Sequence, residues 1–348
     1  MINLSNLLFF TSPIGLGHAT RDIAIAKKLI KLDVQINFVS GQAACSLISS
    51  QGYDVVDAYH PKSFFIQCGQ LRRPLIWLLR YLTYYRECKG ISEGIVNSRQ
   101  CDIIVSDEDF ASVQVASRLN KKHILISDIT ETHFTHGLLS IVEKKMNKSM
   151  RKIMSKCDRV IIPDFGDDEG NVIYVGPIVR EVSSDREALR KKLDFHKKTI
   201  VVSVGGTDAG QQLIDKSLEA FARLRKRLDI DLVVVTGPML TPPIELSHNI
   251  RTNGFIDNLH EYIYAADVVI SLAGRSTIDE SIVYGTPGIF IPIKDHFEQE
   301  WGAKRLGYRY QDIFRLETLI EQALNLNRNA FIENDGALKA AKIILDLM

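Results

Sequence analysis

The hydrophobic pattern divides the chain into two halves that begin in the same way. Residues 7–11 and 199–204 are largely apolar runs of strand length, and each leads through a glycine-containing loop into apolar residues at helical spacing. Short apolar runs and amphipathic segments then alternate through both halves. Because parallel strands covered on both faces read as continuous apolar runs, the pattern predicts an α/β protein with two Rossmann-like domains.

The boundary between the halves lies at a Gly-Pro break. Gly176 and Pro177 are followed by a polar run at residues 181–185, which is typical of a linker. We therefore predict an N-terminal domain over residues 1–177 and a C-terminal domain over residues 178–334.

Residues 253–305 have the pattern of a nucleotide site. A buried strand at 267–272 is followed by a tight turn, a helix from about residue 276 to 284, a second strand at 288–293 and a polar loop. Gly274 allows the backbone to approach an anion, and the helix start favours phosphate through its free N–H groups and its dipole. The predicted phosphate contacts are Gly274, Arg275, Ser276 and Thr277. Glu280 lies one turn further on the same face, where it can accept hydrogen bonds from a ribose diol.

Other polar and glycine residues extend this site. Glu298 and Gln299 follow the strand at 288–293, at the sheet edge where open parallel sheets bind ligands, and a carboxylate beside an amide suits a ligand rich in hydroxyls. Phe255 and Ile256 follow another strand, where an aromatic face and a backbone amide can hold a uracil. The second glycine-rich loop, which lacks the Lys-Ser/Thr of a phosphoryl-transferring P-loop, contains Gly205, Gly206 and Thr207.

His18 is the candidate base. It follows the first strand in the pattern Gly-x-Gly-His-x-x-Arg, residues 15–21, and it either serves catalysis or only caps its helix. Acids at the ends of later strands, Asp107, Asp109 and Asp128, are predicted to converge on it. Asp107 or Asp109 can orient the imidazole, and one acid of the run 107–109 is also expected to cap the following helix.

These motifs resemble those of inverting glycosyltransferases with two facing Rossmann-like domains, the GT-B fold, and most closely the MurG-like group. The resemblance implies an interdomain cleft, a C-terminal helix at 335–348 that returns to the first domain, and a UDP-sugar donor used without metal. It also implies that His18 faces the reacting centre and that Gly17 and Arg180 lie at the donor diphosphate. The residues that carry it are Gly15–Arg21, Gly176-Pro177-x-x-Arg180, Phe255-Ile256-Asp257, Ala266-Asp267-Val268-Val269, Glu280 before Gly285-Thr286-Pro287, and Glu298-Gln299 before Trp301 and Ala303.

Three functions follow from this pattern. The first is transfer of a hexose or N-acetylhexosamine, for example GlcNAc, from a UDP-sugar to an acceptor hydroxyl. The second is hydrolysis of a nucleotide-sugar, as in PseG-like enzymes, whose first loop has the same Gly-x-Gly-His-x-x-Arg pattern. The third is nucleotide-sugar binding without catalysis. The first loop departs from the MurG-like pattern in having Ser12-Pro13-Ile14 ahead of Gly15, so the resemblance does not identify the acceptor.

Composition and charge limit the kind of protein this is and where it is expected to act. A net charge of +1 disfavours a general nucleic-acid binder, and five cysteines without a CxxC pair indicate neither a disulfide framework nor a zinc site. The N-terminus lacks a signal-peptide pattern, so we expect a cytoplasmic protein. Basic and aromatic residues from Arg72 to Arg86 and basic residues from Lys144 to Lys156 suit either an anionic membrane surface, and with it a lipid-linked or glycolipid acceptor, or a solvated helix face.

Overall fold

Two parallel sheets organise the chain. The computed structural model describes residues 5–32, 34–62, 65–67, 69–128, 130–132, 140–205, 208–241 and 249–348. Unit 1 comprises Met1–Ser63, Arg73–Val179 and Asn334–Met348, and unit 2 comprises Phe64–Arg72 and Arg180–Glu333. The division falls near the predicted boundary at Pro177, but residues 64–72, predicted in the first domain, belong to unit 2.

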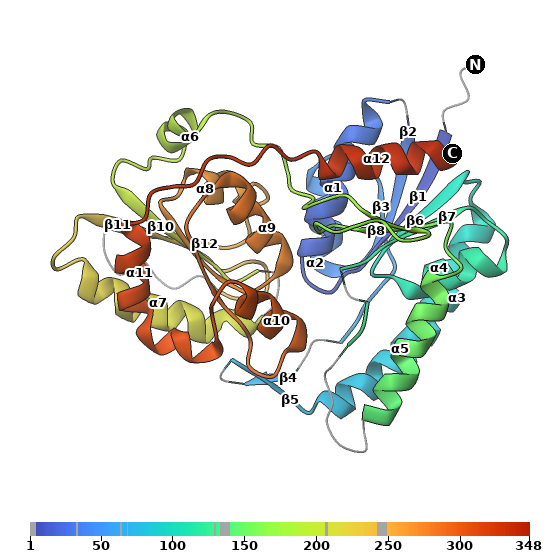
Figure 1. Ribbon diagram of the computed structural model, residues 1–348, viewed down its shortest axis with the longest axis horizontal. Coiled ribbons are helices and arrows are strands. Elements are labelled where there is room, and N and C mark those ends of the chain that lie inside the picture. The colour runs from blue at the N-terminus through green and yellow to red at the C-terminus, as the bar shows by residue number, and fades with distance from the viewer. Residues whose placement is uncertain are drawn as a thin grey trace. The chain divides into compact units, whose positions relative to one another are not determined.

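Unit 1 is built on a sheet with the strand order β3-β2-β1-β6-β7-β8-β9 (Figure 1). Its strands, all paired in parallel, are β1 (Ser5–Thr11), β2 (Val34–Ser40), β3 (Val55–Asp57), β6 (Ile103–Asp107), β7 (His123–Ile126), β8 (Arg159–Ile162) and β9 (Val172–Tyr174). Its helices are α1 (Gly17–Ile30), α2 (Gln42–Ser50), α3 (Pro74–Ser98), α4 (Phe110–Arg118), α5 (Ser140–Met154) and α12 (Gly336–Leu347).

Both faces of this sheet are covered. Leu8 and Phe10 of β1 pack in a cluster with residues of α3 and α4, while Leu7 and Phe9, which point to the opposite face, are buried as well. Helix α12 packs against α1, and Asn334 Nδ2 donates to Pro177 O at 2.7 Å just before it (Figure 1). The C-terminal helix therefore belongs to unit 1.

Unit 2 has a smaller parallel sheet in the order β12-β11-β10-β13-β14. Its strands are β10 (Lys198–Ser203), β11 (Ile230–Val235), β12 (Ile250–Asn253), β13 (Val268–Leu272) and β14 (Gly288–Ile291). Its helices are α6 (Arg186–Lys192), α7 (Gln211–Leu224), α8 (Leu259–Ala265), α9 (Arg275–Tyr284), α10 (Phe297–Arg305) and α11 (Leu316–Leu324), with short 3-10 turns at Asp208–Gly210 and Tyr310–Arg315. The apolar side chains of β10 that face α7 and α11 form the main core of the unit.

Two sequence-based assignments of secondary structure were wrong. The run of apolar, basic and aromatic residues at 71–87 has the pattern of a helix, but residues 71 and 72 end a short antiparallel hairpin of β4 (Phe65–Gln67) and β5 (Gln70–Arg72). Arg73 has a φ of 53°, and Pro74 then starts α3, because proline is well suited to the first turn of a helix.

The second error concerns residues 297–305, where the polar loop is helix α10. Its first turn carries Glu298 and Glu300 and its last turn Lys304 and Arg305. Acids near the N-terminus and bases near the C-terminus interact favourably with the helix dipole. This interaction stabilises α10, which lacks a strong apolar stripe.

Candidate active site

The first candidate site lies where the strand order of unit 1 reverses. The chain proceeds outward from β1 to β2 and β3, then returns to place β6 on the other side of β1. Thr11 and Asp107, the last residues of β1 and β6, are register partners, so the helix that begins at Gly17 starts beside Asp107. Ligands of open α/β sheets bind at such a reversal, outside the carboxyl ends of the strands.

His18 and Asp107 form the centre of this site. The Nδ1 atom of His18 lies 3.0 Å from Oδ1 of Asp107, and the His18 side chain is 21% exposed whereas Asp107 is fully buried. Because Asp107 faces Nδ1, it favours the tautomer that carries its proton there and leaves Nε2 to take a proton from a substrate. The predicted partnership of His18 with a strand-end acid is therefore present, with Asp107 as the acid.

Arg21 holds the acids of the cluster together. It is one helical turn after His18 and buried, and it binds both oxygens of Asp107, with Nε donating to Oδ2 at 2.8 Å. One of its η nitrogens also lies 3.4 Å from Oδ2 of Asp128. Asp128 thus reaches the same cluster, as the sequence predicted.

Two further carboxyl groups complete the cluster, those of the buried Asp22 and the half-buried Glu108, and the sequence analysis did not single them out. Asp22 accepts a hydrogen bond from Thr11 Oγ1 at 2.7 Å, and Glu108 accepts from Ser127 Oγ at 2.6 Å and from Asp128 N at 2.9 Å. For Asp22 the sequence did contain a signal, because Arg21 and Asp22 follow His18 by three and four residues and so lie near it on the same helix.

The electrostatics of the cluster divide its acids into two classes. Burial raises the pKa of Asp22 and of Glu108 well above the usual carboxyl range, and a neighbouring carboxylate, Asp107 for Asp22 and Asp128 for Glu108, raises it further. Burial also disfavours the charged form of Asp107 and Asp128, but Arg21 and His18 outweigh it and lower the pKa of both. The carboxylates of Asp107 and Asp128 therefore face two cationic side chains, Arg21 and His18.

The pKa of His18 follows from the same balance. Burial lowers it, but the charge and the hydrogen bond of Asp107 raise it more, to about 9. At pH 7 the free protein therefore holds His18 largely as the imidazolium.

Asp109 is the predicted acid that the structure does not bring to His18. Its Oδ1 accepts from the backbone N–H groups of Ala111 and Ser112 and so caps α4, while Oδ2 accepts from the hydroxyl of Tyr59 at 2.8 Å. Asp109 is therefore the acid of the run 107–109 that caps a helix. It directly precedes α4, whereas Asp107 ends β6.

The pH dependence of activity tests this arrangement. Only neutral His18 can accept a proton, and with a pKa of about 9 the neutral fraction rises about tenfold per pH unit below that value. We expect kcat/KM to rise between pH 6.5 and 8.5 and to level off near 9, instead of levelling near the ordinary histidine value of ~6.5 that the sequence alone suggests. A profile already flat above pH 7.5 would contradict the ion pair with Asp107.

The second candidate site lies at the equivalent reversal in unit 2. Strands β10 and β13 are neighbours, β11 and β12 lie on one side, and β14 lies on the other. Gly205 follows β10 with a φ of 74°, and Gly274 follows β13. The predicted glycine loops therefore flank the reversal point, although Gly206 and Thr207 lie outside the described residues.

The start of α9 has the features predicted for an anion site. Gly274 is its N-cap, no side chain caps it, and a Cβ on Gly274 would meet no atom within 4 Å. Ser276 and Thr277 are half-buried in the first turn, where backbone N–H groups have no partner within the helix. Arg275 is turned to Asp279 in a two-bond contact of 2.8 and 3.0 Å.

Arg180 and Glu280, 100 residues apart, meet in a buried salt bridge. Nε of Arg180 donates to Oε1 of Glu280 at 3.0 Å, an η nitrogen donates to Asp257 O at 2.7 Å, and both side chains are about 95% buried. The sequence assigned these residues to a diphosphate and a ribose separately. The structure adds that each charge balances the other.

Four other predicted donor residues lie at the same edge of the unit 2 sheet, whereas Gly17, also predicted at the diphosphate, begins α1 in unit 1. Phe255 and Ile256 follow β12 and are half-buried. Glu298 and Gln299 are in the first turn of α10, and Gln299 Oε1 accepts from Ile293 N at 3.0 Å, which leaves its amide nitrogen to act as a donor.

The hairpin of β4 and β5 braces the segment that leads into α10. Leu71 N donates to Lys294 O at 2.9 Å, Lys294 N donates to Gly69 O at 2.8 Å, and Gln70 Nε2 donates to Asp295 Oδ2 at 2.6 Å. Leu71 is buried in the core of unit 2. Nothing in the short strands of residues 65–72 indicated a partner more than 200 residues away.

Comparison with known proteins agrees with this arrangement. Residues 199–339 match the family model of the glycosyltransferase family 28 C-terminal domain. The chain is also similar along its whole length to a solved glycosyltransferase of kitacinnamycin, with a TM-score of 0.70, 14% identity and 99% of both chains covered. The protein is a glycosyltransferase of the GT-B fold. A calicheamicin glycosyltransferase matches this GT-B glycosyltransferase with a TM-score of 0.65, 14% identity and coverage of 99% of this chain and 98% of the other.

Two curated relatives are similar over most of this GT-B glycosyltransferase. An uncharacterized glycosyltransferase of Methanopyrus kandleri is 25% identical over 72% of this chain and 77% of its own length. The UDP-N-acetylglucosamine–N-acetylmuramyl-(pentapeptide) pyrophosphoryl-undecaprenol N-acetylglucosamine transferase of a Thermoanaerobacter species is 24% identical over 79% of this chain and 76% of its own. The resemblance to the MurG-like group that the motifs indicated is confirmed.

Proposed function

We propose that this glycosyltransferase transfers a hexose or N-acetylhexosamine from a UDP-sugar to an acceptor hydroxyl with inversion and without a metal ion. The observation that carries the proposal is the pair of His18 and the buried Asp107 at the strand reversal of unit 1. In this mechanism Nε2 of His18 takes the proton of the acceptor hydroxyl as its oxygen attacks the sugar carbon, and the bond from that carbon to UDP breaks. Asp107 stabilises the imidazolium that forms.

The donor is proposed to bind unit 2. The N-terminus of α9 and the loop at Gly205 offer backbone N–H groups to the diphosphate, Glu280 the ribose contact, and Glu298 and Gln299 the sugar contacts. UDP-GlcNAc is the first donor to test, because the Thermoanaerobacter relative is named for its use of UDP-N-acetylglucosamine.

Asp107 and Asp109 have the Asp-x-Asp spacing of a metal-binding motif, but both carboxylates are engaged in other contacts. Asp107 binds Arg21 and His18, and Asp109 caps α4, so the run 107–109 does not present converging oxygens to a cation. This supports donor binding through protein groups alone.

Thermal unfolding tests metal independence. UDP at 100 times its dissociation constant is expected to add about 2.7 kcal/mol to the free energy of unfolding, both with EDTA and with Mg²⁺. The midpoint should be measured with UDP in each condition and with EDTA alone. A stabilisation by UDP that disappears with EDTA would disprove the metal-independent donor site.

Gln299 is expected to act on the sugar and not on UDP. Gln299→Ala removes the amide donor, and losing a hydrogen bond of about 1 to 1.5 kcal/mol weakens binding of the UDP-sugar roughly five- to tenfold. Binding of UDP should stay unchanged, which titration calorimetry with both ligands would show. Equal losses for both ligands would place Gln299 in a structural role, through its bond to Ile293 N.

Hydrolysis is separated from transfer by incubating the enzyme with a UDP-sugar alone. A hydrolase releases free sugar at its full rate, whereas a transferase releases it far more slowly than it glycosylates an acceptor. We expect the second result, and the similar proteins reported above are named as transferases.

A lipid-linked or glycolipid acceptor at the cytoplasmic face of a membrane is part of the proposal. Helices α3 and α5 both pack against α4, and they expose Leu79 (66%) and Ile141 (53%) among basic residues. Apolar side chains between cations suit adsorption to an anionic bilayer. Within the described residues, no helix has the length and apolar character needed to span a membrane. The predicted segment from Arg72 to Arg86 lies in α3 except for its first two residues, and most of the segment from Lys144 to Lys156 lies in α5.

A further inference from the structure

A tight turn at residues 293–296 leads from β14 into α10. His296 N donates to Ile293 O at 3.2 Å and closes it. Asp295, the third residue of the turn, has a φ of 64°, in the left-handed region that glycine adopts readily and other residues adopt rarely. A strained residue of this kind persists only where surrounding contacts hold it, and such residues cluster at functional sites. The turn therefore depends on contacts from elsewhere in the chain.

The hairpin of β4 and β5 supplies those contacts. Its backbone forms two hydrogen bonds with Lys294, which donates to Gly69 O at 2.8 Å and accepts from Leu71 N at 2.9 Å. The side-chain amide of Gln70 donates to the carboxylate of Asp295 at 2.6 Å. The hairpin thus binds both central residues of the turn, one through backbone groups and the other through Gln70.

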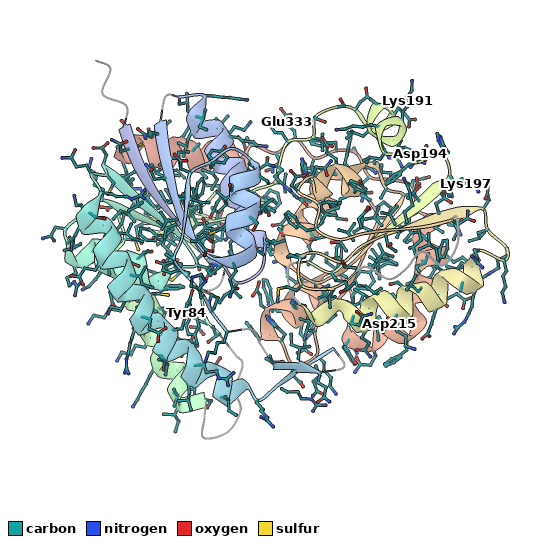
Figure 2. The ribbon with its side chains drawn as sticks, turned by 180° about the vertical axis from the view of Figure 1, so that it is seen from behind. Tyr84, Lys191, Asp194, Lys197, Asp215 and Glu333 are labelled. Atoms are coloured by element: carbon teal, nitrogen blue, oxygen red, sulfur yellow. The ribbon has the colours of Figure 1, made fainter. Side chains whose placement is uncertain are left out.

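The hairpin is itself anchored in unit 2. Leu71 is part of the buried core of the unit. A Cβ on Gly69 would meet the side-chain oxygen of Gln212 in the first turn of α7, so these two segments are in close contact. Figure 1 shows the hairpin beside α10, and Figure 2 shows it from behind, near the end of α7 at which Asp215 is labelled. The hairpin can therefore hold the turn against a fixed support.

The turn in its place fixes the start of α10. Gln299 Oε1 accepts from Ile293 N at 3.0 Å, and Glu300 Oε1 accepts from Asp295 N at 3.0 Å. Two side chains of the first helical turn are therefore bonded to the backbone of the turn at residues 293–296. A small displacement of a binding group is enough to weaken its contact with a ligand. The position of Gln299, a proposed sugar contact, thus depends on the conformation of the turn.

We infer that the hairpin of residues 65–72 is a positioning element for the donor sugar, in which Gln70 acts through Asp295 on Gln299. The inference rests on the proposed function, and it adds a residue from the first half of the sequence to the recognition of the donor. The proposed ribose and phosphate contacts at α9 come from another segment. Loss of Gln70 should therefore affect the sugar and not the UDP part of the donor.

Gln70→Ala in the full chain tests this role by titration calorimetry. The ligands are UDP and the UDP-sugar that wild type binds most tightly among UDP-GlcNAc, UDP-GalNAc and UDP-glucose. We expect the UDP-sugar to bind about three- to tenfold more weakly, as for loss of one hydrogen bond, and UDP to bind as in wild type. Gln67→Ala is the matched control, because Gln67 is the exposed register partner of Gln70 in the same hairpin, and it should bind both ligands normally.

Two double variants show whether Gln70 acts through the turn. Asp295→Gly in the Gln70→Ala background should recover most of the lost affinity, because glycine adopts a positive φ without support. Gln70→Ala combined with Gln299→Ala should bind the UDP-sugar within about twofold of Gln299→Ala alone, since coupled residues do not contribute additively. Losses that multiply in the second variant, or no recovery in the first, would overturn the positioning role.

The outcomes also separate this inference from the function on which it rests. Wild-type protein that binds neither UDP nor any of the three UDP-sugars would refute the proposed function, and Gln299→Ala with equal losses for both ligands would refute the proposed sugar contact. If Gln299→Ala weakens only the UDP-sugar while Gln70→Ala binds both ligands like wild type, or weakens both equally, the positioning role alone is refuted.

Discussion

His18→Ala is expected to lower the turnover number at least about a hundredfold, because a positioned general base contributes roughly 10²- to 10⁴-fold. UDP affinity should stay within a few-fold of wild type, since the proposed donor contacts all lie in unit 2. Initial-rate kinetics and calorimetry with UDP would measure the two quantities, and UDP binding also shows that the variant is folded.

A matched control comes from the same unit. His60 is 63% exposed, and its nearest acid, Asp57, is 3.8 Å away, so His60→Ala should keep wild-type turnover. If His18→Ala retained most of its turnover while binding UDP normally, His18 would be only a structural residue at the start of α1. The search for the base would then move to Asp128 and Asp107.

Glu280→Ala is expected to affect both stability and donor binding. It leaves Arg180 buried without its carboxylate, and breaking a buried pair in this way costs about 3–5 kcal/mol of unfolding free energy. It also removes the proposed ribose contact, a hydrogen bond to a charged group of about 1.5–3 kcal/mol, so UDP and the UDP-sugar should both bind about 10- to 100-fold more weakly. Chemical denaturation and calorimetry would measure the two effects.

A double variant separates the two roles. Arg180→Met with Glu280→Leu replaces the ion pair by apolar side chains of similar size, which often restores the stability lost on breaking a buried pair. Donor affinity should stay low, because the ribose acceptor is still missing. If affinity returned together with stability, Glu280 would act on the donor only through the fold of unit 2.

Local sequence patterns were sufficient to predict the fold class and most of the strands and helices. Strands such as β1 and β13 are largely apolar runs, and the glycines after β10 and β13 mark where the backbone turns into a helix. Both signals arise from neighbours in the chain. The predicted α/β class and the GT-B fold were therefore confirmed, as was the relation to MurG-like glycosyltransferases.

The local sequence pattern does not determine which donor sugar or which acceptor the enzyme prefers. The resemblance predicts a UDP-sugar, and nothing in the local pattern of residues 253–305 selects one sugar over another. Specificity depends on which side chains meet around the ligand, and this is set by packing between distant segments.

Local periodicity marks strand ends and helix starts, so the places of His18 and the strand-end acids along the chain could be predicted without a structure. Which acids meet His18 depends instead on how the strands of the sheet pair. The parallel register of β1 and β6 places Thr11 opposite Asp107, whereas Asp109, two residues later, is turned into the cap of α4. The bracing of Lys294 and Asp295 by the hairpin at residues 65–72 and the pairing of Arg180 with Glu280 were decided in the same way. These contacts join residues about 100 or more positions apart, and they form because burial of a charge or of a backbone group requires a partner that local sequence does not supply.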